Sequence, residues 1–319
     1  MILIVGARGR LGGAVTRRLL AAGQSVRAMT RTPSQLADLA ARGAEVVAGD
    51  LRDPASLARA CRGVDRVLAA AHAFDGAGAN VPATVDDAGN RALVDAARAA
   101  GVEHVVFTSI QGARADHPID IWRDKARAES YLSASGLSHT ILRPSAFMEL
   151  WTDIVGTPIV RQGRPMIFGR GTNPINFVAV ADVARYAVFA LDDPRARGQI
   201  IEVGGPDNVS LLAFARMIER ALGRAPATPR HIPLAMMRVM GVVARPVNPA
   251  FARQVRAGVL MDTTDMSMDP GPTLRRFPLD APELTRLEDV VARRYGAGEV
   301  TIADTRRDQS VASANGTPT

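Results

Sequence analysis

The first residues with a clear chemical meaning are three glycines near the start of the chain. Gly6, Gly9 and Gly12 follow the apolar run 1–5 and open a stretch whose apolar residues recur at helical spacing. Glycine lets the backbone approach a pyrophosphate closely, and free N–H groups at a helix N-terminus attract its charge. A tight turn with close helix–strand packing would also explain the glycines, and Gly13 needs no more than that. In this context the pattern predicts a dinucleotide-binding loop, with expected contacts from Gly6, Arg8, Gly9, Arg10, Leu11 and Gly12.

The residues after the second apolar run indicate which dinucleotide this loop would bind. An NAD site usually has an acidic residue at the end of the second strand, where it bonds the ribose 2′-hydroxyl. No acidic residue lies between Ser25 and Leu36, and Arg31 occupies that place. A guanidinium can clamp a 2′-phosphate with two hydrogen bonds. We therefore expect NADP(H) to be preferred over NAD(H); a solvated surface arginine is the alternative.

Further cofactor contacts are expected at the ends of the third and fourth apolar runs. Asp50 and Leu51 follow the third run, at an edge where an aspartate can accept from the adenine amino group. Capping of the following turn explains Asp50 equally well. Ala70 and Ala71 end the fourth run, and their small side chains would let a cofactor lie flat across the strand ends.

The composition singles out one cation. The chain has 39 lysines and arginines, and Lys125 is the only lysine among them. An ammonium is a compact donor, whereas a guanidinium is a planar fork, so the two are not interchangeable. Lys125 is therefore a candidate site residue wherever a second observation places it at a site; a chance surface lysine is the alternative.

The alternation of apolar runs with helical stretches predicts the scaffold that positions these residues. Strands are expected at 1–5, 25–30, 44–49, 64–70, 104–109 and 137–143, and helices at 10–22, 33–41, 54–61, 85–100 and 121–135. Such alternation is typical of an α/β fold with a doubly wound parallel sheet, the Rossmann fold. We expect an NAD(P)-binding domain over residues 1–150.

The second half of the chain alternates less regularly. Gly and Pro residues over 156–174 suggest a loop, strands are expected at 175–180 and 199–205, and helices at 181–192 and 209–222. Met and Val at helical spacing over 232–262 predict helices that cover the substrate side, with the methionines mainly in the core. Residues 151–296 are thus expected to hold the remaining sheet elements and a small, mainly helical substrate lobe that ends in a helix over 282–295. Residues 297–319 are expected to form a disordered tail.

Length and composition restrict the class of protein. The 319 residues are 47% hydrophobic and 22% charged, which excludes global disorder. The net charge is +7, but the arginines are scattered and aromatic residues are only 4%, so nucleic-acid binding is not expected. Cys61 is the single cysteine, no cluster has metal-ligand spacing, and no apolar run approaches the roughly 18 residues that cross a bilayer. We expect a cytoplasmic protein with neither a metal nor a membrane partner.

Five segments together resemble the NmrA-like branch of the atypical short-chain dehydrogenase/reductases. They are the glycine pattern and the segments 26–31, 46–51, 89–109 and 135–149. The resemblance covers residues 1–205 well and the remainder loosely. It implies a Rossmann fold, NADP(H) binding and a small C-terminal substrate lobe. Members of this branch include reductases of quinones, dyes and other small organic molecules, and also cofactor-sensing regulators with little or no catalysis.

The resemblance also implies where catalytic groups would lie. The larger superfamily uses a serine and a Tyr-x-x-x-Lys motif; the serine falls on Ser109, or on Thr108 just before it, and the lysine on Lys125. The ammonium is then expected to donate to the nicotinamide ribose hydroxyls, so that its substitution would weaken cofactor binding with little effect on stability. The tyrosine is absent, because Ile121 stands four residues before Lys125 and cannot transfer a proton.

Two histidines are candidates for the missing proton donor. His72 follows the fourth strand and His117 lies in the loop after the fifth, and imidazole titrates near neutral pH. A loop residue with no chemical role is the alternative for both. By the resemblance, the turn after the sixth strand lies near the nicotinamide, with Pro144 at the cofactor, and the substrate would meet His117, Phe147 and Met148.

The sequence therefore predicts an NADP(H)-binding oxidoreductase that transfers hydride to a small organic acceptor, with quinones among the candidates. The alternative is a non-catalytic NADP-sensing regulator that binds a partner protein. A sugar-nucleotide epimerase or dehydratase would need the tyrosine that Ile121 replaces. A homodimer and a regulatory protein partner both stay open at this point.

Overall fold

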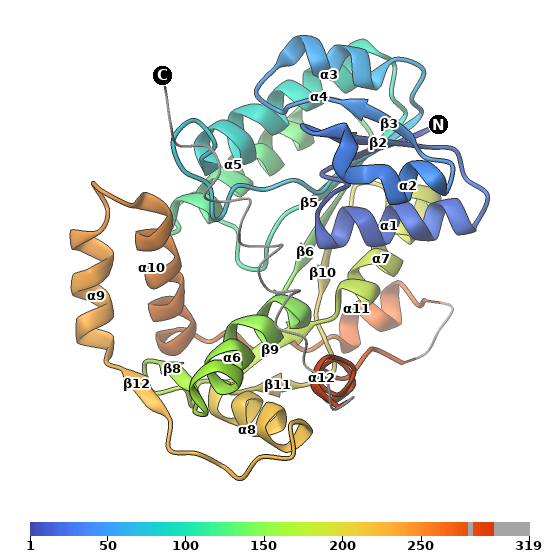
Figure 1. The fold of residues 1–319 in the computed structure, drawn as a ribbon. Helices are drawn as coiled ribbons and strands as arrows, with labels where there is room; N and C mark the ends of the chain where they lie inside the picture. Colours follow the sequence, from blue (N-terminus) through green and yellow to red (C-terminus); the bar gives the residue numbers. More distant parts are fainter. Residues whose placement is uncertain (280–282, 297–319) are drawn as a thin grey trace.

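Seven parallel strands form the sheet that carries the candidate residues (Figure 1). The computed structural model describes residues 1–279 and 283–296. The strand order is β10-β6-β5-β4-β1-β2-β3. From β1, the chain adds β2 and β3 on one side and then returns to add β4, β5 and β6 on the other side. Doubly wound sheets bind ligands at such a switch point, outside the carboxyl ends of the strands. The strands are β1 (Ile2–Val5), β2 (Val26–Thr30), β3 (Glu45–Ala48), β4 (Arg66–Ala69), β5 (His104–Thr108), β6 (His139–Pro144) and β10 (Ile200–Val203). The predicted Rossmann fold is confirmed.

Two helices, α1 (Arg10–Ala21) and α7 (Val180–Asp192), pack side by side over one face of the sheet (Figure 1). Leu11, Val15 and Leu19 of α1 recur every four residues and are buried together with β-strand residues in one apolar core. That spacing puts all three on one helix face, so burying the stripe fixes the orientation of the helix and of the glycine loop before it.

The other face is covered by α3 (Pro54–Cys61), α4 (Asn90–Ala99) and α5 (Asp120–Ala134). Leu57, Leu93 and Leu132, one from each helix, are at most 1% exposed in the second apolar core. A 3-10 turn (Pro33–Leu36) and α2 (Ala37–Ala41) connect β2 to β3. The single helix predicted over 85–100 is divided, because a π-helical segment, η2 (Ala83–Gly89), precedes α4.

A smaller, mainly helical lobe follows β6. Its core joins Phe177 and Phe214, whose rings meet edge to face, with apolar residues of the surrounding helices. The lobe's helices are α6 (Met148–Gln162), α8 (Leu211–Ala221), α9 (Leu234–Val243), α10 (Pro249–Thr263), α11 (Gly271–Arg276) and α12 (Leu287–Tyr295). Its strands are β7 (Ala146–Phe147), β8 (Met166–Phe168), β9 (Ile175–Val178), β11 (Asn208–Val209) and β12 (Arg230–Ile232).

The loop predicted over 156–174 is wrong in its first half, because α6 continues through Gly156 and Pro158 to Gln162. Gly156 does not break the helix but makes room for a neighbour: a Cβ added there would lie 2.1 Å from the hydroxyl of Tyr295 in α12. That hydroxyl donates to the carbonyl of Thr152, 3.0 Å away. The tail predicted over 297–319 lies outside the described residues.

Candidate functional site

The glycine loop connects β1 to α1 and owes its shape to backbone contacts alone. Gly6 has φ +88°, and the N–H of Gly9 donates to its carbonyl at 2.9 Å. A Cβ added at Gly12 would lie 2.3 Å from that same carbonyl oxygen, so only glycine fits. Helix α1 begins after Gly9 with no side-chain cap and no acidic residue in its first turn. Its first N–H groups therefore remain available to an anion.

The predicted alanines lie against this loop. A Cβ added at Gly6 would be 2.8 Å from the backbone nitrogen of Ala71 and 3.0 Å from the carbonyl carbon of Ala70. The close approach needs glycine on one side and brings the ends of β1 and β4 together. The structure thus places the glycine loop and the alanine pair at one edge of the sheet, as the sequence predicted.

The other residues predicted in the loop differ in exposure. Arg8 is exposed, and Leu11 is 6% exposed in the apolar core, so a contact from Leu11 would have to come from its backbone. Arg10 donates to Asp153 of α6 at 2.7 Å, with both side chains partly exposed. This ion pair connects the start of α1 to the C-terminal lobe.

Lys125, on α5, is buried beneath the ends of β4 and β5. Its side chain is 5% exposed, and its ammonium donates to the carbonyl of Thr108 at 2.9 Å, with a longer contact of 3.5 Å to the carbonyl of Ala71. The Phe107 ring lies 4.8 Å from the ammonium. Lys125 is therefore not a surface accident, since it joins two strand ends at the predicted cofactor edge.

Asp86 is the site residue that the sequence did not reveal. It lies in η2, is fully buried, and places Oδ1 3.1 Å from the Lys125 ammonium. This contact is an ion pair without the alignment of a hydrogen bond, whereas Oδ2 accepts from the N–H of Ala73 at 2.9 Å. The only available signal was Asp-Asp at 86–87 within an otherwise apolar and small stretch. Single turns of π-helix are frequent at functional sites.

Three polar groups at the end of β5 have no hydrogen-bond partner among the described residues. They are Thr108 Oγ1, Ser109 Oγ and Gln111 Oε1, and the two hydroxyl residues are 8% and 6% exposed. Buried polar groups are normally satisfied, so unpaired ones call for a ligand or water. Together with the glycine loop, these groups fit a dinucleotide that runs from the start of α1 to the ends of β4 and β5.

The two candidate histidines have different surroundings. The His72 side chain is exposed, but many protein atoms lie near it, and the resulting partial desolvation lowers the pKa of its imidazole while Asp86 opposes the shift. His117 is 3% exposed, stacks on Trp122 at 4.9 Å and accepts from the N–H of Ile119 through Nδ1. Burial lowers its pKa too. Each imidazole accepts a backbone N–H through Nδ1, from Phe74 to His72 and from Ile119 to His117, so the difference in exposure is what favours His72 as a proton donor.

The residues around the missing tyrosine are apolar. Ile121 is 3% exposed and forms a small cluster with Trp122 of the same helix and Ala257 of α10. Position 121 therefore helps to pack α5 against the C-terminal lobe. Tyr131 is six residues after Lys125, about 240° around the helix, and donates to Asp95 of α4 at 2.8 Å, away from the lysine.

The residues of the turn after β6, which were predicted to contact cofactor or substrate, differ in their burial. Pro144 ends β6 and its carbonyl accepts from the N–H of Gln111 at 3.0 Å, while Phe147 is half-buried in β7. Met148 is 1% exposed in the core of the C-terminal lobe, where its methyl packs close to Gly205. The side chain of Met148 is used in packing, so its predicted contact with substrate gains no support from the structure.

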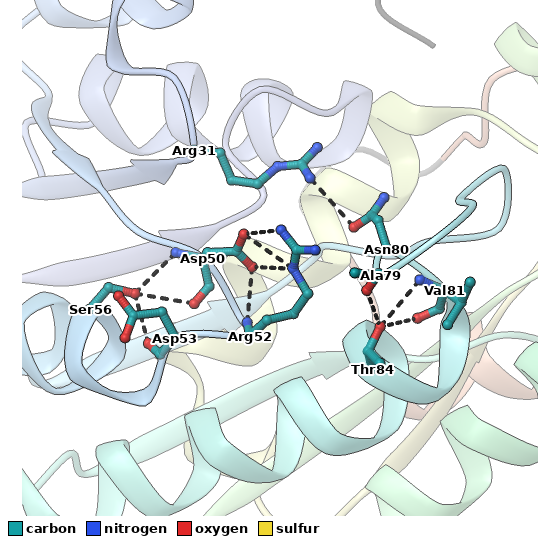
Figure 2. A network of polar contacts seen from close by, with 9 residues as sticks. All are labelled: Arg31, Asp50, Arg52, Asp53, Ser56, Ala79, Asn80, Val81 and Thr84. Carbon is teal, nitrogen blue, oxygen red and sulfur yellow. Dashed lines mark hydrogen bonds and ion pairs between the residues drawn. The ribbon is translucent and has the colours of Figure 1, made fainter. Parts of the chain in front are cut away.

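At the opposite end of the edge, Arg31 and Asp50 lie in a polar network (Figure 2). Arg31 is exposed and approaches Asn80 Oδ1 at 3.5 Å, a weak contact that leaves the guanidinium available. The Asp50 carboxylate accepts from the backbone and side chain of Arg52, whose hydrogen bonds lower the pKa of that carboxyl. The structure thus favours turn formation for Asp50, the alternative to an adenine contact. Leu51 is 5% exposed and packs against Gly89 of η2.

Two further features bear on the kind of protein this is: a possible metal site and a possible membrane-spanning helix. Among the described residues, no group of three His, Cys, Asp or Glu side chains could hold a metal ion. In the same part of the chain, no helix is both long and apolar enough to cross a membrane.

Comparison with known proteins agrees with this geometry. The family model described as NAD(P)H-binding matches residues 6–194. The chain is 32% identical over 225 residues to the NAD(P)H azoreductase of Xenophilus azovorans, covering 70% of this chain and 74% of that protein. It is 27% identical over 298 residues to the Photosystem II assembly factor Ycf39 of Synechocystis sp., covering 92% and 90%.

Solved structures give the same fold. An NADPH-dependent quinone oxidoreductase from Escherichia coli superposes with a TM-score of 0.74 at 22% identity, covering 92% of this chain and 99% of that one. At this identity the likeness shows the fold alone. The match of the family model over more than half of the chain, and the azoreductase relative, show more: the chain belongs to the NAD(P)H-binding family.

Proposed function

We propose that the chain is an NADPH-dependent reductase of the NmrA-like type that passes hydride to a small organic acceptor, with quinones and azo compounds as the first candidates. One observation carries the proposal: the glycine loop, the Lys125–Asp86 pair and the unpaired groups of Thr108 and Ser109 lie along one sheet edge. The azoreductase relative supports the reaction class.

The chain's own residues would bind and orient the cofactor, which supplies the hydride. The start of α1 would hold the pyrophosphate, and the exposed guanidinium of Arg31 the 2′-phosphate. The Lys125 ammonium donates to the carbonyls of Thr108 and Ala71 and faces Asp86, and a ribose hydroxyl could replace the longer contact to Ala71. His72 is the accessible group beside this end that could deliver a proton to the reduced acceptor.

The test is NADPH oxidation, followed by absorbance, with a panel of quinones and azo dyes. The expected result is turnover with at least one acceptor, and its loss in Gly12→Ala, whose loop cannot keep the same shape. Gly13→Ala is the matched control, because a Cβ there would meet its nearest atom at 3.2 Å rather than 2.3 Å. Tight NADPH binding without turnover of any acceptor would contradict the proposal.

That outcome would favour the second candidate, a cofactor-binding protein that acts through a protein partner. Two observations support it. The position of the superfamily's tyrosine is Ile121, buried in an apolar cluster. The assembly-factor relative also matches 92% of the chain, whereas the azoreductase matches 70%.

A further inference from the structure

Helix α9 exposes an apolar face that nothing in the described structure covers. Of the nine large apolar side chains that are exposed among the described residues, six lie between Met236 and Phe251. Within α9, Val239 is 62% exposed, Val242 73% and Val243 66%. Such a concentration of exposed apolar surface marks an interaction site.

The face follows from the helical geometry. At about 100° per residue, Met236, Val239, Val242 and Val243 fall within about 120° of one another. Met237 and Gly241 lie on the opposite side, where both are buried. There Gly241 packs against Arg256 of α10, and Figure 1 shows α9 as the outer helix of the α9–α10 pair. A helix that is apolar all round is normally buried on all sides, whereas α9 is buried on one.

The chain segment that carries this face is basic. Between Glu219 and Asp262 the chain has no acidic residue and seven arginines, an excess equal to the net charge of +7 of the whole chain. The charged residues outside this segment therefore cancel as a whole, so the segment accounts for the entire net charge. Five of the seven are exposed, among them Arg238 within α9 and Arg245 just after it.

We propose that the exposed face of α9 docks on an anionic lipid surface, with the valines and Met236 in the interface and Arg238 and Arg245 among the headgroups. An interfacial helix needs an apolar face and flanking cations, and anionic lipids attract arginine. The helix would lie on the membrane rather than cross it. This departs from the sequence-based expectation of no membrane partner.

Other occupants fit the face less well. A second copy of the chain would bring the same unbalanced arginines together, and like charges across an interface are unfavourable. A protein partner usually meets aromatic anchors and a hydrogen-bonding rim. Helix α9 has no aromatic residue, and Arg238 is its only polar side chain. A lipid surface requires neither feature.

The test is sedimentation of the full chain with vesicles of phosphatidylcholine alone and of phosphatidylcholine with phosphatidylglycerol in equal parts. We expect binding to the anionic vesicles and release by salt. The double variant Val239→Ser/Val243→Ser should lower the bound-to-free ratio by about tenfold or more, and Arg238→Gln/Arg245→Gln should abolish the preference for phosphatidylglycerol. Substitutions at exposed positions should leave the melting temperature nearly unchanged.

Matched controls are available on the same chain. Ile200→Ser removes an apolar side chain that is 50% exposed in β10, and Arg42→Gln removes an exposed arginine after α2; neither should change vesicle binding. Absence of binding to the anionic vesicles, or equal losses in the control variants, would overturn the proposal. So would a lipid-free dimer that the valine variants dissociate, because the face would then be an interface between copies.

Discussion

The two ends of the candidate cofactor site are built in different ways. The glycine loop is a local structure, in which seven consecutive residues position one another through backbone contacts. The Lys125 end is assembled from side chains and carbonyls contributed by β4, η2, β5 and α5. We therefore expect the glycine loop to be disturbed by an added side-chain atom, and the Lys125 end by the loss of one charge of its buried pair. Substitutions can test this contrast directly.

The largest expected effect is at the Lys125 end. Lys125→Met would leave the Asp86 carboxylate buried without its counter-charge, and breaking a buried pair in this way costs about 3–5 kcal/mol of stability. This differs from the sequence-based expectation that substitution of Lys125 has little effect on stability. The measurement is the free energy of unfolding in urea without cofactor.

A second variant shows whether the pair itself is responsible. Lys125→Met/Asp86→Asn removes the stranded charge and should be more stable than Lys125→Met alone, because an asparagine oxygen can still accept from Ala73. Arg127→Met is the control, since that side chain is 56% exposed and its ion pair with Asp124 contributes little. Equal stability of the wild type and Lys125→Met would show that the buried pair has no structural role.

At the glycine loop the effect should fall on binding rather than on folding. Gly12→Ala forces a Cβ against the Gly6 carbonyl, which must move and take the loop with it. We expect NADPH affinity to fall by about a hundredfold, or about 2.7 kcal/mol. Titration of NADPH fluorescence measures this, beside a thermal melt without cofactor.

The melt decides how the loss is interpreted. Alanine is favoured over glycine inside a helix by roughly 1 kcal/mol, which offsets part of any strain in the free protein. A large loss of stability with unchanged NADPH affinity would reverse the contrast between the two ends. Gly13→Ala should lose little of either.

The sequence predicted the local glycine loop better than it predicted the Lys125 end, which is assembled from distant segments. Gly6, Gly9 and Gly12 were identified because their spacing and their place between a strand and a helix carry the whole signal. Lys125 was placed by its rarity and by the resemblance. Asp86 was missed, because its role depends on η2 packing against α5, which brings it to Lys125, and no short motif records that contact.

The sequence also did not reveal which residues have their side chains packed in the core. Leu51 and Met148 have the right places in the chain for ligand contacts, but their side chains fill the core. Gly156 was interpreted as a helix breaker because nothing local reveals that Tyr295, in α12, occupies the space beside it. Burial against distant residues decides all three cases, and hydrophobic periodicity does not report which partner is present.

A smaller effect is expected at the adenosine end. If Arg31 holds the 2′-phosphate, Arg31→Ala should weaken NADPH binding by about 1.5–3 kcal/mol, the scale of a hydrogen bond to a charged group. NADH binding should barely change. Calorimetric titration with both cofactors measures the difference, and equal losses would show that Arg31 does not distinguish them. Arg52→Ala is the matched control, because Arg52 is held by Asp50 instead.

The smallest expected effect is a pH dependence that only the Lys125 end can generate, since residues 6–12 contain no carboxylate or imidazole. Burial raises the pKa of Asp124, next to Lys125, from 3.8 to about 6, against the pull of Arg127. The folded state thus holds a proton that the unfolded state releases, so this group makes stability fall as the pH rises from 3.8 to about 6. Asp124→Asn removes that slope and should raise the free energy of unfolding at neutral pH by about 1 kcal/mol.

The contribution of Asp124 is the difference between the free energies of unfolding of Asp124→Asn and the wild type, measured at each pH. His104, at the start of β5, has the opposite sign: burial lowers its pKa from 6.5 to about 4, so its contribution is lost on acidification through an overlapping window. The two groups partly cancel in the wild type, and a flat profile there says nothing about either. Because His104 is present in both proteins, subtraction leaves Asp124 alone. A difference that stays constant between pH 4 and pH 6 would mean that Asp124 titrates as an ordinary carboxyl, and that burial at this end of the site is less complete than its contacts imply.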